Sequence, residues 1–300
     1  MNYLQRKWRS ISIGFLFVTY MVVIVFMQHP ISTWFIIAGS WILLHLIVYL
    51  CTFVGVLVNL LQGITRRQEP SVPFFKLAYH LGTKNATILA SYGLIMLREN
   101  KAEIAMQCFD RALEHNAYFL TTKTLMCNKA IALWKLDRVD DAIALYLEVI
   151  ERFGRDDQKF VTDRSYDQEG IDDLVANNDY MYPQDYTTLG FLYTLKEQYE
   201  EALFFSHAAL AKKEGFASAY DNIGQIYYFQ GDMALAKENF DKSLELNPKL
   251  PDSLYFAALL AKDEGNLEDA YALLVRAKSC KLDGLNTISY EMIDELKRSL

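Results

Sequence analysis

The sequence has little of what catalytic and metal sites usually require. Its 300 residues include four cysteines and five histidines, and no pair of them has the spacing of a metal site. It contains no glycine-rich phosphate loop, no zinc-protease motif and no nucleophile elbow. We therefore predict that the protein is not an enzyme and that it holds no metal or other cofactor.

The cysteines also lack the pattern of a disulfide framework. Cys51, Cys108, Cys127 and Cys280 are widely separated, and Cys51 lies within an apolar run. This distribution favours free thiols in a reducing compartment.

The acidic residues lack the order that a calcium loop needs. The stretch DRSYDQEGIDDL, residues 163–174, contains several carboxylates, but its glycine is not at the sixth position and no glutamate stands at the twelfth. It belongs to an acidic insertion, residues 157–182. We expect this insertion to be a solvated loop with one short helix near Ile171.

Two stretches of the N-terminal region lack charge altogether. They are residues 11–27 and 34–61, and a helix needs about 20 apolar residues to cross a bilayer. A cleaved signal peptide is the alternative for the first stretch. No small-x-small cleavage site follows it, however, and the second apolar run comes at once. We predict a transmembrane hairpin over residues 1–62 that contacts the lipid bilayer through residues 11–61.

Positive charge predicts the orientation of this hairpin. Arg6, Lys7 and Arg9 precede the first span, Arg66 and Arg67 follow the second, and the connecting loop carries none. Basic residues are retained on the cytoplasmic side. We therefore predict an integral protein of the cell or inner membrane, with both termini and the following domain in the cytoplasm.

One titratable side chain, His45, lies deep in the second predicted span. Intramembrane ionisable residues are candidates for function. In an antiparallel hairpin, Thr19 and Tyr20 would lie at a similar depth and offer hydrogen-bond partners. We favour a structural interhelical bond over proton handling.

The rest of the chain is a succession of similar units. Residues 217–250 place small and large apolar residues on two helical stripes, and the same offsets recur 34 residues earlier and later. Two earlier units align when short insertions are allowed. Only small residues let two helix backbones cross closely. The recurring small residues are Gly93, Ala105, Ala130, Ala142, Gly190, Ala202, Gly224, Ala236, Ala258 and Ala270.

This pattern resembles the tetratricopeptide repeat family. The resemblance implies an all-α fold, in which the hairpin is followed by an α-solenoid: a right-handed superhelix of five helix pairs over residues 86–284. Residues 63–85 then form a linker with a half-repeat cap, for which an amphipathic helix on the membrane surface is the alternative. Residues 285–300 are expected to form a capping helix, because an open end would expose apolar surface.

The resemblance also implies a concave groove lined by the first helix of each unit. Asn128 and Asn222 share one groove position, where each amide is expected to face solvent and to hold the backbone of an extended peptide. The alternative for the aromatic residues is simple packing between adjacent units. The chaperone-tail clamp of the family, with basic residues at set positions, is not matched. The predicted groove residues are Asn128, Ile131, Trp134, Phe191, Asn222, Gln225, Tyr228 and Tyr255.

Charge and groove together predict the class of partner. Residues 1–80 carry six Lys/Arg and one acidic residue, whereas residues 81–300 carry 24 and 36, a net charge of −12. Such a body repels a phosphate backbone, so nucleic acid is not expected. We predict a membrane-anchored scaffold or adaptor whose cytoplasmic groove binds a protein or an extended peptide. The alternative is an accessory subunit of a membrane complex for transport, secretion or envelope assembly, acting through its hairpin.

Overall fold

The computed structural model describes residues 38–43, 45–47, 49–50, 53–54, 72–115, 119–154 and 166–300. They belong to two units, Met1–Thr83 and Lys84–Leu300, and each is considered by itself. Every regular element among the described residues is a helix.

The first unit contains α3 (Val72–His80), whose buried residues are Phe75 and Ala78. The described residues between 38 and 54 are helical and carry exposed large apolar side chains. Within the described part of the chain, we find no helix of the length and apolarity needed to span a bilayer. The first predicted span and much of the second lie outside the described residues.

His45 also belongs to the first unit. Its Nδ1 lies 3.1 Å from the carbonyl oxygen of Trp41, and the two rings are 4.0 Å apart. The described contact of His45 is therefore within its own helix. The predicted partners Thr19 and Tyr20 lie outside the described residues.

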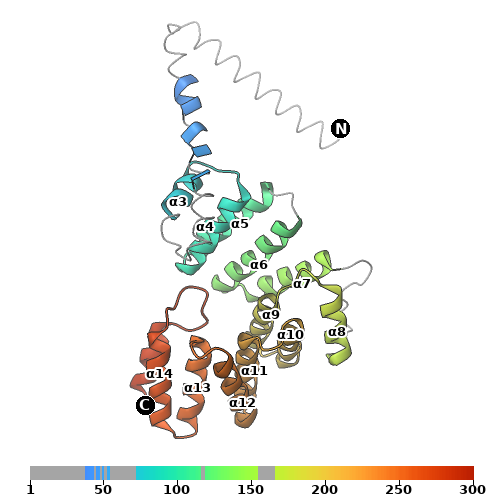
Figure 1. Ribbon diagram of the computed structural model, residues 1–300, viewed down its shortest axis with the longest axis vertical. Coiled ribbons are helices and arrows are strands. Elements are labelled where there is room, and N and C mark those ends of the chain that lie inside the picture. Colours follow the sequence, from blue (N-terminus) through green and yellow to red (C-terminus); the bar gives the residue numbers. More distant parts are fainter. Residues whose placement is uncertain are drawn as a thin grey trace. The chain divides into compact units, whose positions relative to one another are not determined.

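The second unit is a stack of helix pairs (Figure 1). In each pair the two helices pack on each other, and each pair packs on the next. This is the α-solenoid that the sequence predicts. The pairs are α4 (Ala86–Arg98) with α5 (Ala102–His115), α6 (Phe119–Lys135) with α7 (Val139–Phe153), α9 (Pro183–Leu195) with α10 (Tyr199–Lys212), α11 (Ala217–Gln230) with α12 (Met233–Leu246), and α13 (Pro251–Asp263) with α14 (Leu267–Ser279).

Local sequence explains where these helices begin and how closely they cross. The side chain of Asn85 accepts a hydrogen bond from the Ile88 amide at the start of α4, and Asp232 caps α12 in the same way. Pro183 stands in the first turn of α9, where its missing N–H costs nothing. The recurring small residues, among them Ala105 and Ala236, are fully buried. The capping residues thus explain where the helices begin, and the small residues explain how closely the helices cross.

A buried ion pair joins the second helix pair to the third. Lys123 of α6 donates to the carboxylate of Asp185 in α9, and both side chains are almost fully buried. The Lys123 ammonium also lies 4.5 Å from the centre of the Tyr182 ring, and Asp185 accepts a hydrogen bond from the Tyr182 amide at 2.8 Å. Each charge therefore has a partner, which a buried ion requires.

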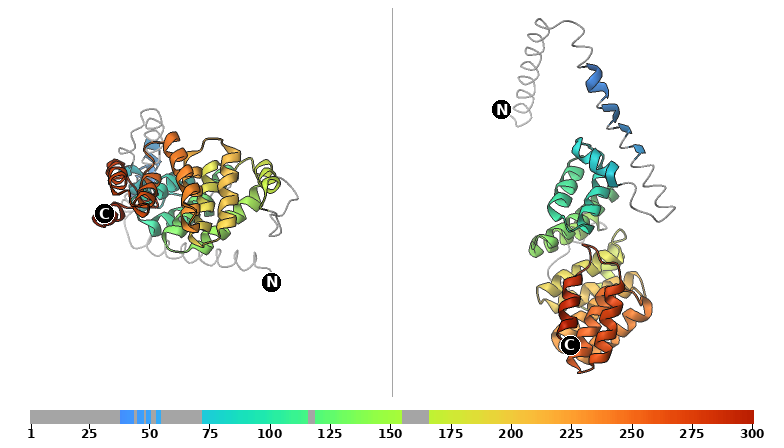
Figure 2. Two further views of the ribbon diagram at one scale, coloured as in Figure 1. Left: turned by 90° about the horizontal axis from the view of Figure 1, so that it is seen from below. Right: turned by 90° about the vertical axis from the view of Figure 1, so that its left-hand side faces the viewer.

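Two shorter helices complete the unit. α8 (Gln168–Asn177) lies within the acidic insertion and contacts α10, burying Ile171 and Leu174. α15 (Tyr290–Arg298) contacts α14 at the C-terminal end, where Figure 2 shows the orange and red helices side by side. The terminal helix thus starts at Tyr290, later than the sequence suggests, because the residues before it form an irregular segment.

Candidate protein-binding site

The first helices of the pairs contact one another along the stack: α4 with α6, α6 with α9, α9 with α11, and α11 with α13. They therefore line one side of the solenoid, which we call the first-helix face. The predicted groove residues all lie on these helices.

Trp134 of α6 and Phe191 of α9 meet on this face. Their ring centres are 5.0 Å apart in an edge-to-face arrangement, and both side chains are partly exposed. Lys135 places its ammonium 3.8 Å from the centre of the Trp134 ring. This part of the face therefore combines an aromatic surface with a positive charge.

A second aromatic group lies towards the C-terminal end. The rings of Tyr228, Phe229 and Phe256 pack edge to face, and Phe229 is 50% exposed. The Tyr228 hydroxyl donates to the Asp263 carboxylate at 2.6 Å. Tyr255 contacts Phe256 but is only 9% exposed. The predicted aromatic residues thus fall into two groups, and Tyr255 mainly supports the second.

The predicted amide residues behave differently from one another. Asn128 and Ile131 are half-buried on α6. Asn222 is 8% exposed, and its Nδ2 donates to the carbonyl oxygen of Thr187 at 2.6 Å. The expectation that the Asn222 amide faces solvent is therefore wrong, because the neighbouring helix α9 approaches closely enough to take its hydrogen bond.

Gln225 is also buried, within a polar cluster between α11 and α13. Its Nε2 donates to Oδ2 of Asp221 at 2.9 Å, while the Ser253 hydroxyl donates to Oδ1 at 2.7 Å. Burial raises the pKa of Asp221 from 3.8 to about 8, and the negative charge of Asp252 adds to this effect. The cluster holds the two helices together and leaves Gln225 unable to meet a ligand without rearrangement.

The first-helix face already holds a piece of polypeptide. Residues 282–288, between α14 and α15, reach the ends of α4 and α6 (Figure 1). We call them the return segment. Lys135 Nζ donates to the Asn286 carbonyl oxygen at 2.9 Å, and the Gly284 amide donates to the Arg98 carbonyl oxygen at 2.8 Å. One backbone carbonyl and one backbone amide of the segment are thus bound by two different helices.

Asp252, at the start of α13, holds the same segment from the other side. Its carboxylate accepts hydrogen bonds from Asn286 Nδ2 at 3.1 Å, from the Thr287 amide at 3.0 Å, and from the Thr287 hydroxyl. Burial lowers the pKa of Lys135, and the nearby carboxylates of Asp252 and Asp283 oppose that shift. The site therefore presents a carboxylate and an ammonium to one short stretch of chain.

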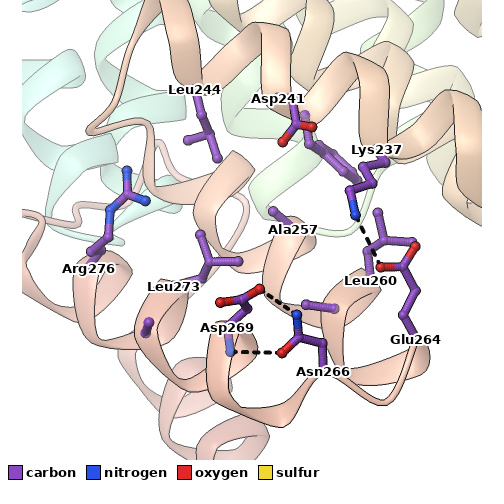
Figure 3. Close-up of a pocket in the computed structure, with 13 residues that line it drawn as sticks. Lys237, Asp241, Leu244, Ala257, Leu260, Glu264, Asn266, Asp269, Leu273 and Arg276 are labelled. Carbon is purple, nitrogen blue, oxygen red and sulfur yellow. Dashed lines mark hydrogen bonds and ion pairs between the residues drawn. The ribbon is translucent and has the colours of Figure 1, made fainter.

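A pocket of about 290 Å³ lies elsewhere, among α12, α13 and α14 (Figure 3). Leu244, Leu260 and Leu273 are among its apolar lining residues. Its charged groups are largely paired, as in the 3.5 Å contact between Lys237 Nζ and Glu264. This arrangement offers an apolar floor but no cluster of groups that could activate a bond.

The described residues include no candidate metal site, and two of their three thiols are buried. Among them, no group of three His, Cys, Asp or Glu residues could hold a metal ion. Cys108, Cys127 and Cys280 are free thiols, and burial raises the pKa of Cys108 to about 12. A thiol with this pKa is a poor nucleophile at neutral pH.

Residues 217–250, which form α11 and α12, match the model of the tetratricopeptide repeat family. The chain contains a tetratricopeptide repeat at this place. No curated protein matches the sequence. Among solved structures, the fold is similar to TTC0263, a thermophilic tetratricopeptide-repeat protein of Thermus thermophilus. The TM-score is 0.52 and the identity 18%, over 71% of this chain and 98% of that one.

Two further solved structures have a fold similar to that of this chain. PilW, described as a type IV pilus biogenesis factor, has a TM-score of 0.54 and 15% identity, over 81% of this chain and 96% of its own. The pilF protein of Pseudomonas aeruginosa has a TM-score of 0.50 and 15% identity, over 86% and 99%. At these identities the likeness establishes the fold alone.

The groove residues predicted from the sequence do not include those that hold the return segment. The family's groove positions include the second and thirteenth of each first helix. Counted from Ala86, Arg98 is the thirteenth; Lys135 and Asp252 take the thirteenth and second positions of their own units. A search of those positions for charge would have found these residues. The local pattern carries no sign of what they bind.

Proposed function

We propose that this protein is a membrane-anchored scaffold or adaptor that binds a protein or peptide partner on its first-helix face. The observation that carries the proposal is that this face binds polypeptide backbone. Lys135 donates to the carbonyl oxygen of Asn286, and Asp252 accepts from the amide of Thr287. Main-chain groups occur in every protein partner, so a face that pairs with them is suited to protein recognition.

The aromatic groups on the same face support this role. Trp134 and Phe191 form one partly exposed pair, and Tyr228 with Phe229 forms another. Aromatic side chains offer large contact areas and lose little conformational entropy on binding. They would supply apolar contact on the same face as the polar site.

We also propose that the N-terminal region anchors the protein in a membrane, with both termini in the cytoplasm. The proposal rests on the uncharged runs 11–27 and 34–61 and on the distribution of Arg and Lys around them. Large apolar side chains from Trp41 to Phe53 are exposed, which suits contact with lipid. A reporter fused after Leu300 should be active only in the cytoplasm. Activity on the opposite side of the membrane would refute the two-span arrangement.

Site-specific crosslinking in cells tests the binding face. A photoreactive residue at Trp134 or Phe229 should crosslink to a partner protein. The same residue at Val275, an exposed position on the second helix α14, should not. Equal crosslinking from all three positions would show that the face has no special role.

A second candidate function is favoured by the exposed apolar side chains between residues 41 and 53. In this case the protein is an accessory subunit of a membrane complex and contacts its partners through the hairpin. Photoreactive residues at Leu46 or Leu50 would then capture the partner, while Trp134 and Phe229 would not. The two patterns of crosslinking are mutually exclusive, so one set of variants decides between the candidates.

A further inference from the structure

The return segment, residues 282–288, is held by three first helices that are far apart in sequence. Its contacts come from Arg98 at the end of α4, Lys135 at the end of α6 and Asp252 at the start of α13. Gly284 and Ile288 are buried. These contacts define a preformed binding site, and the return segment occupies it.

The occupant is a turn rather than an extended strand. The Asp283 amide donates to Oδ1 of Asn286 at 2.9 Å, and the Leu285 amide donates to Oδ1 of Asp283 at 2.9 Å. The Asn286 amide closes the turn on the Asp283 carbonyl oxygen at 3.1 Å. Asp and Asn side chains stabilise turns by these local hydrogen bonds. The site therefore recognises a compact shape that the sequence DGLN favours by itself.

Gly284 is required by the closeness of this fit. A Cβ on Gly284 would overlap the carbonyl oxygen of Leu97 and lie 2.7 Å from Oδ1 of Asn100. The Leu97 carbonyl cannot move away cheaply, because its oxygen already accepts a hydrogen bond from the Asn100 amide at 3.0 Å. The site thus excludes every residue except glycine at this point of the turn.

Charge sets the neighbouring requirements. Arg98 Nε lies 3.7 Å from the Asp283 carboxylate, so an acidic residue is favoured before the glycine. The Asp252 carboxylate accepts from both the amide and the hydroxyl of Thr287, so a hydroxyl residue is favoured after the asparagine. The ligand that fits is an acidic residue, glycine, any residue, asparagine, and then threonine or serine.

We propose that the return segment is an internal ligand of the first-helix face, and that the partner protein displaces it with a turn of the same chemical pattern. This inference rests on the proposed function, since it describes the partner that the face selects. An internal ligand acts at an effective concentration of the order of millimolar. The apparent Kd of every external ligand is therefore its intrinsic Kd divided by the fraction of molecules in which the segment has left the site, and loss of the segment should restore the affinity.

The test measures binding of a fluorescent peptide with the sequence of residues 281–289 to the full-length protein. Gly284→Ala removes the segment from the site but leaves Arg98, Lys135 and Asp252 unchanged. The peptide should bind this variant at least about tenfold more tightly than the parent protein. Lys281→Ala, an exposed residue just outside the segment, is the matched control and should behave like the parent.

Two further variants keep the result decisive. Thr287→Val removes only the hydroxyl that donates to Asp252, so it should release the segment partially. Because this change is small, the variant should fold even if Gly284→Ala does not. Asp252→Asn in the Gly284→Ala background should abolish peptide binding, as should alanine at the glycine of the peptide. Equal peptide affinity for the parent and for folded releasing variants would overturn the inference.

The crosslinking experiment separates this inference from the proposed function. If Trp134 crosslinks to a partner equally in the parent and in Gly284→Ala, the face binds a partner but the segment does not compete. If the peptide binds Gly284→Ala and neither protein crosslinks from the face, the internal ligand stands and the proposed function fails. Stronger crosslinking in Gly284→Ala, together with peptide binding, supports both.

Discussion

Gly224 of α11 lies against Phe240 of α12 so closely that a Cβ on Gly224 would sit 2.7 Å from two carbon atoms of the phenylalanine ring. Phe240 is fully buried, so its ring has little room to shift. We predict that Gly224→Ala destabilises the protein by about 1–3 kcal/mol, the usual cost of overpacking a core. Thermal or urea unfolding measures the change.

A second substitution provides the control for this prediction. Phe240→Leu should cost stability alone, because it leaves a cavity, but should cost less in the Gly224→Ala background, where it makes room for the added methyl group. Strictly additive effects of the two changes would show that Gly224 and Phe240 do not constrain each other.

The two asparagines at one repeat position should differ in their effect on stability. Asn222→Ala removes a buried hydrogen bond to Thr187 and should cost about 1 kcal/mol. Asn128→Ala, at the equivalent but half-buried position, should change stability by less than about 0.5 kcal/mol. Unfolding curves of the two variants test this difference, and an equal loss would contradict it.

The buried ion pair between α6 and α9 should be costly to break from one side. Lys123→Met leaves the Asp185 carboxylate buried without its counter-charge and should destabilise the protein by about 3–5 kcal/mol. Adding Asp185→Asn removes the stranded charge but keeps an oxygen for the Tyr182 amide. The double variant should therefore be more stable than Lys123→Met. If the double variant is less stable than Lys123→Met, the stability of the protein does not depend on Lys123 neutralising the Asp185 carboxylate.

Asp221 should make stability fall as pH rises. Its pKa is raised by burial from 3.8 to about 8, so between these values the folded state binds a proton that the unfolded state has lost. This contribution is complete below pH 4 and disappears as pH rises towards 8. Asp221→Asn mimics the neutral acid, so its melting temperature should fall less than that of the parent from pH 5 to pH 8. Parallel pH profiles would refute this assignment.

The helix pairs could be predicted from the sequence because their signal is local. Small residues such as Ala202 and Ala236 recur at a spacing of 34 residues, and each packs within its own pair. The candidate site, in contrast, depends on contacts between residues far apart in the chain, which the 34-residue repeat does not predict. Lys135 and Asn286 are 151 residues apart, and Asn222 meets Thr187 only because α9 lies beside α11. The burial of Asn222 and the path of residues 282–288 therefore became evident only in three dimensions.

The contact of Gly284 with the end of α4 ties the last helix pair to the first. In an ordinary repeat array each unit contacts only its neighbours. The terminal units can therefore unfold locally, and the array can stretch along its axis. Here the return segment joins the two ends of the array. Local unfolding at either end would therefore require the return segment to leave its site. Hydrogen exchange at α4 and α13 should accordingly respond together when Gly284 is replaced. The repeat array, which could otherwise stretch, would thus keep a single length until the return segment is released.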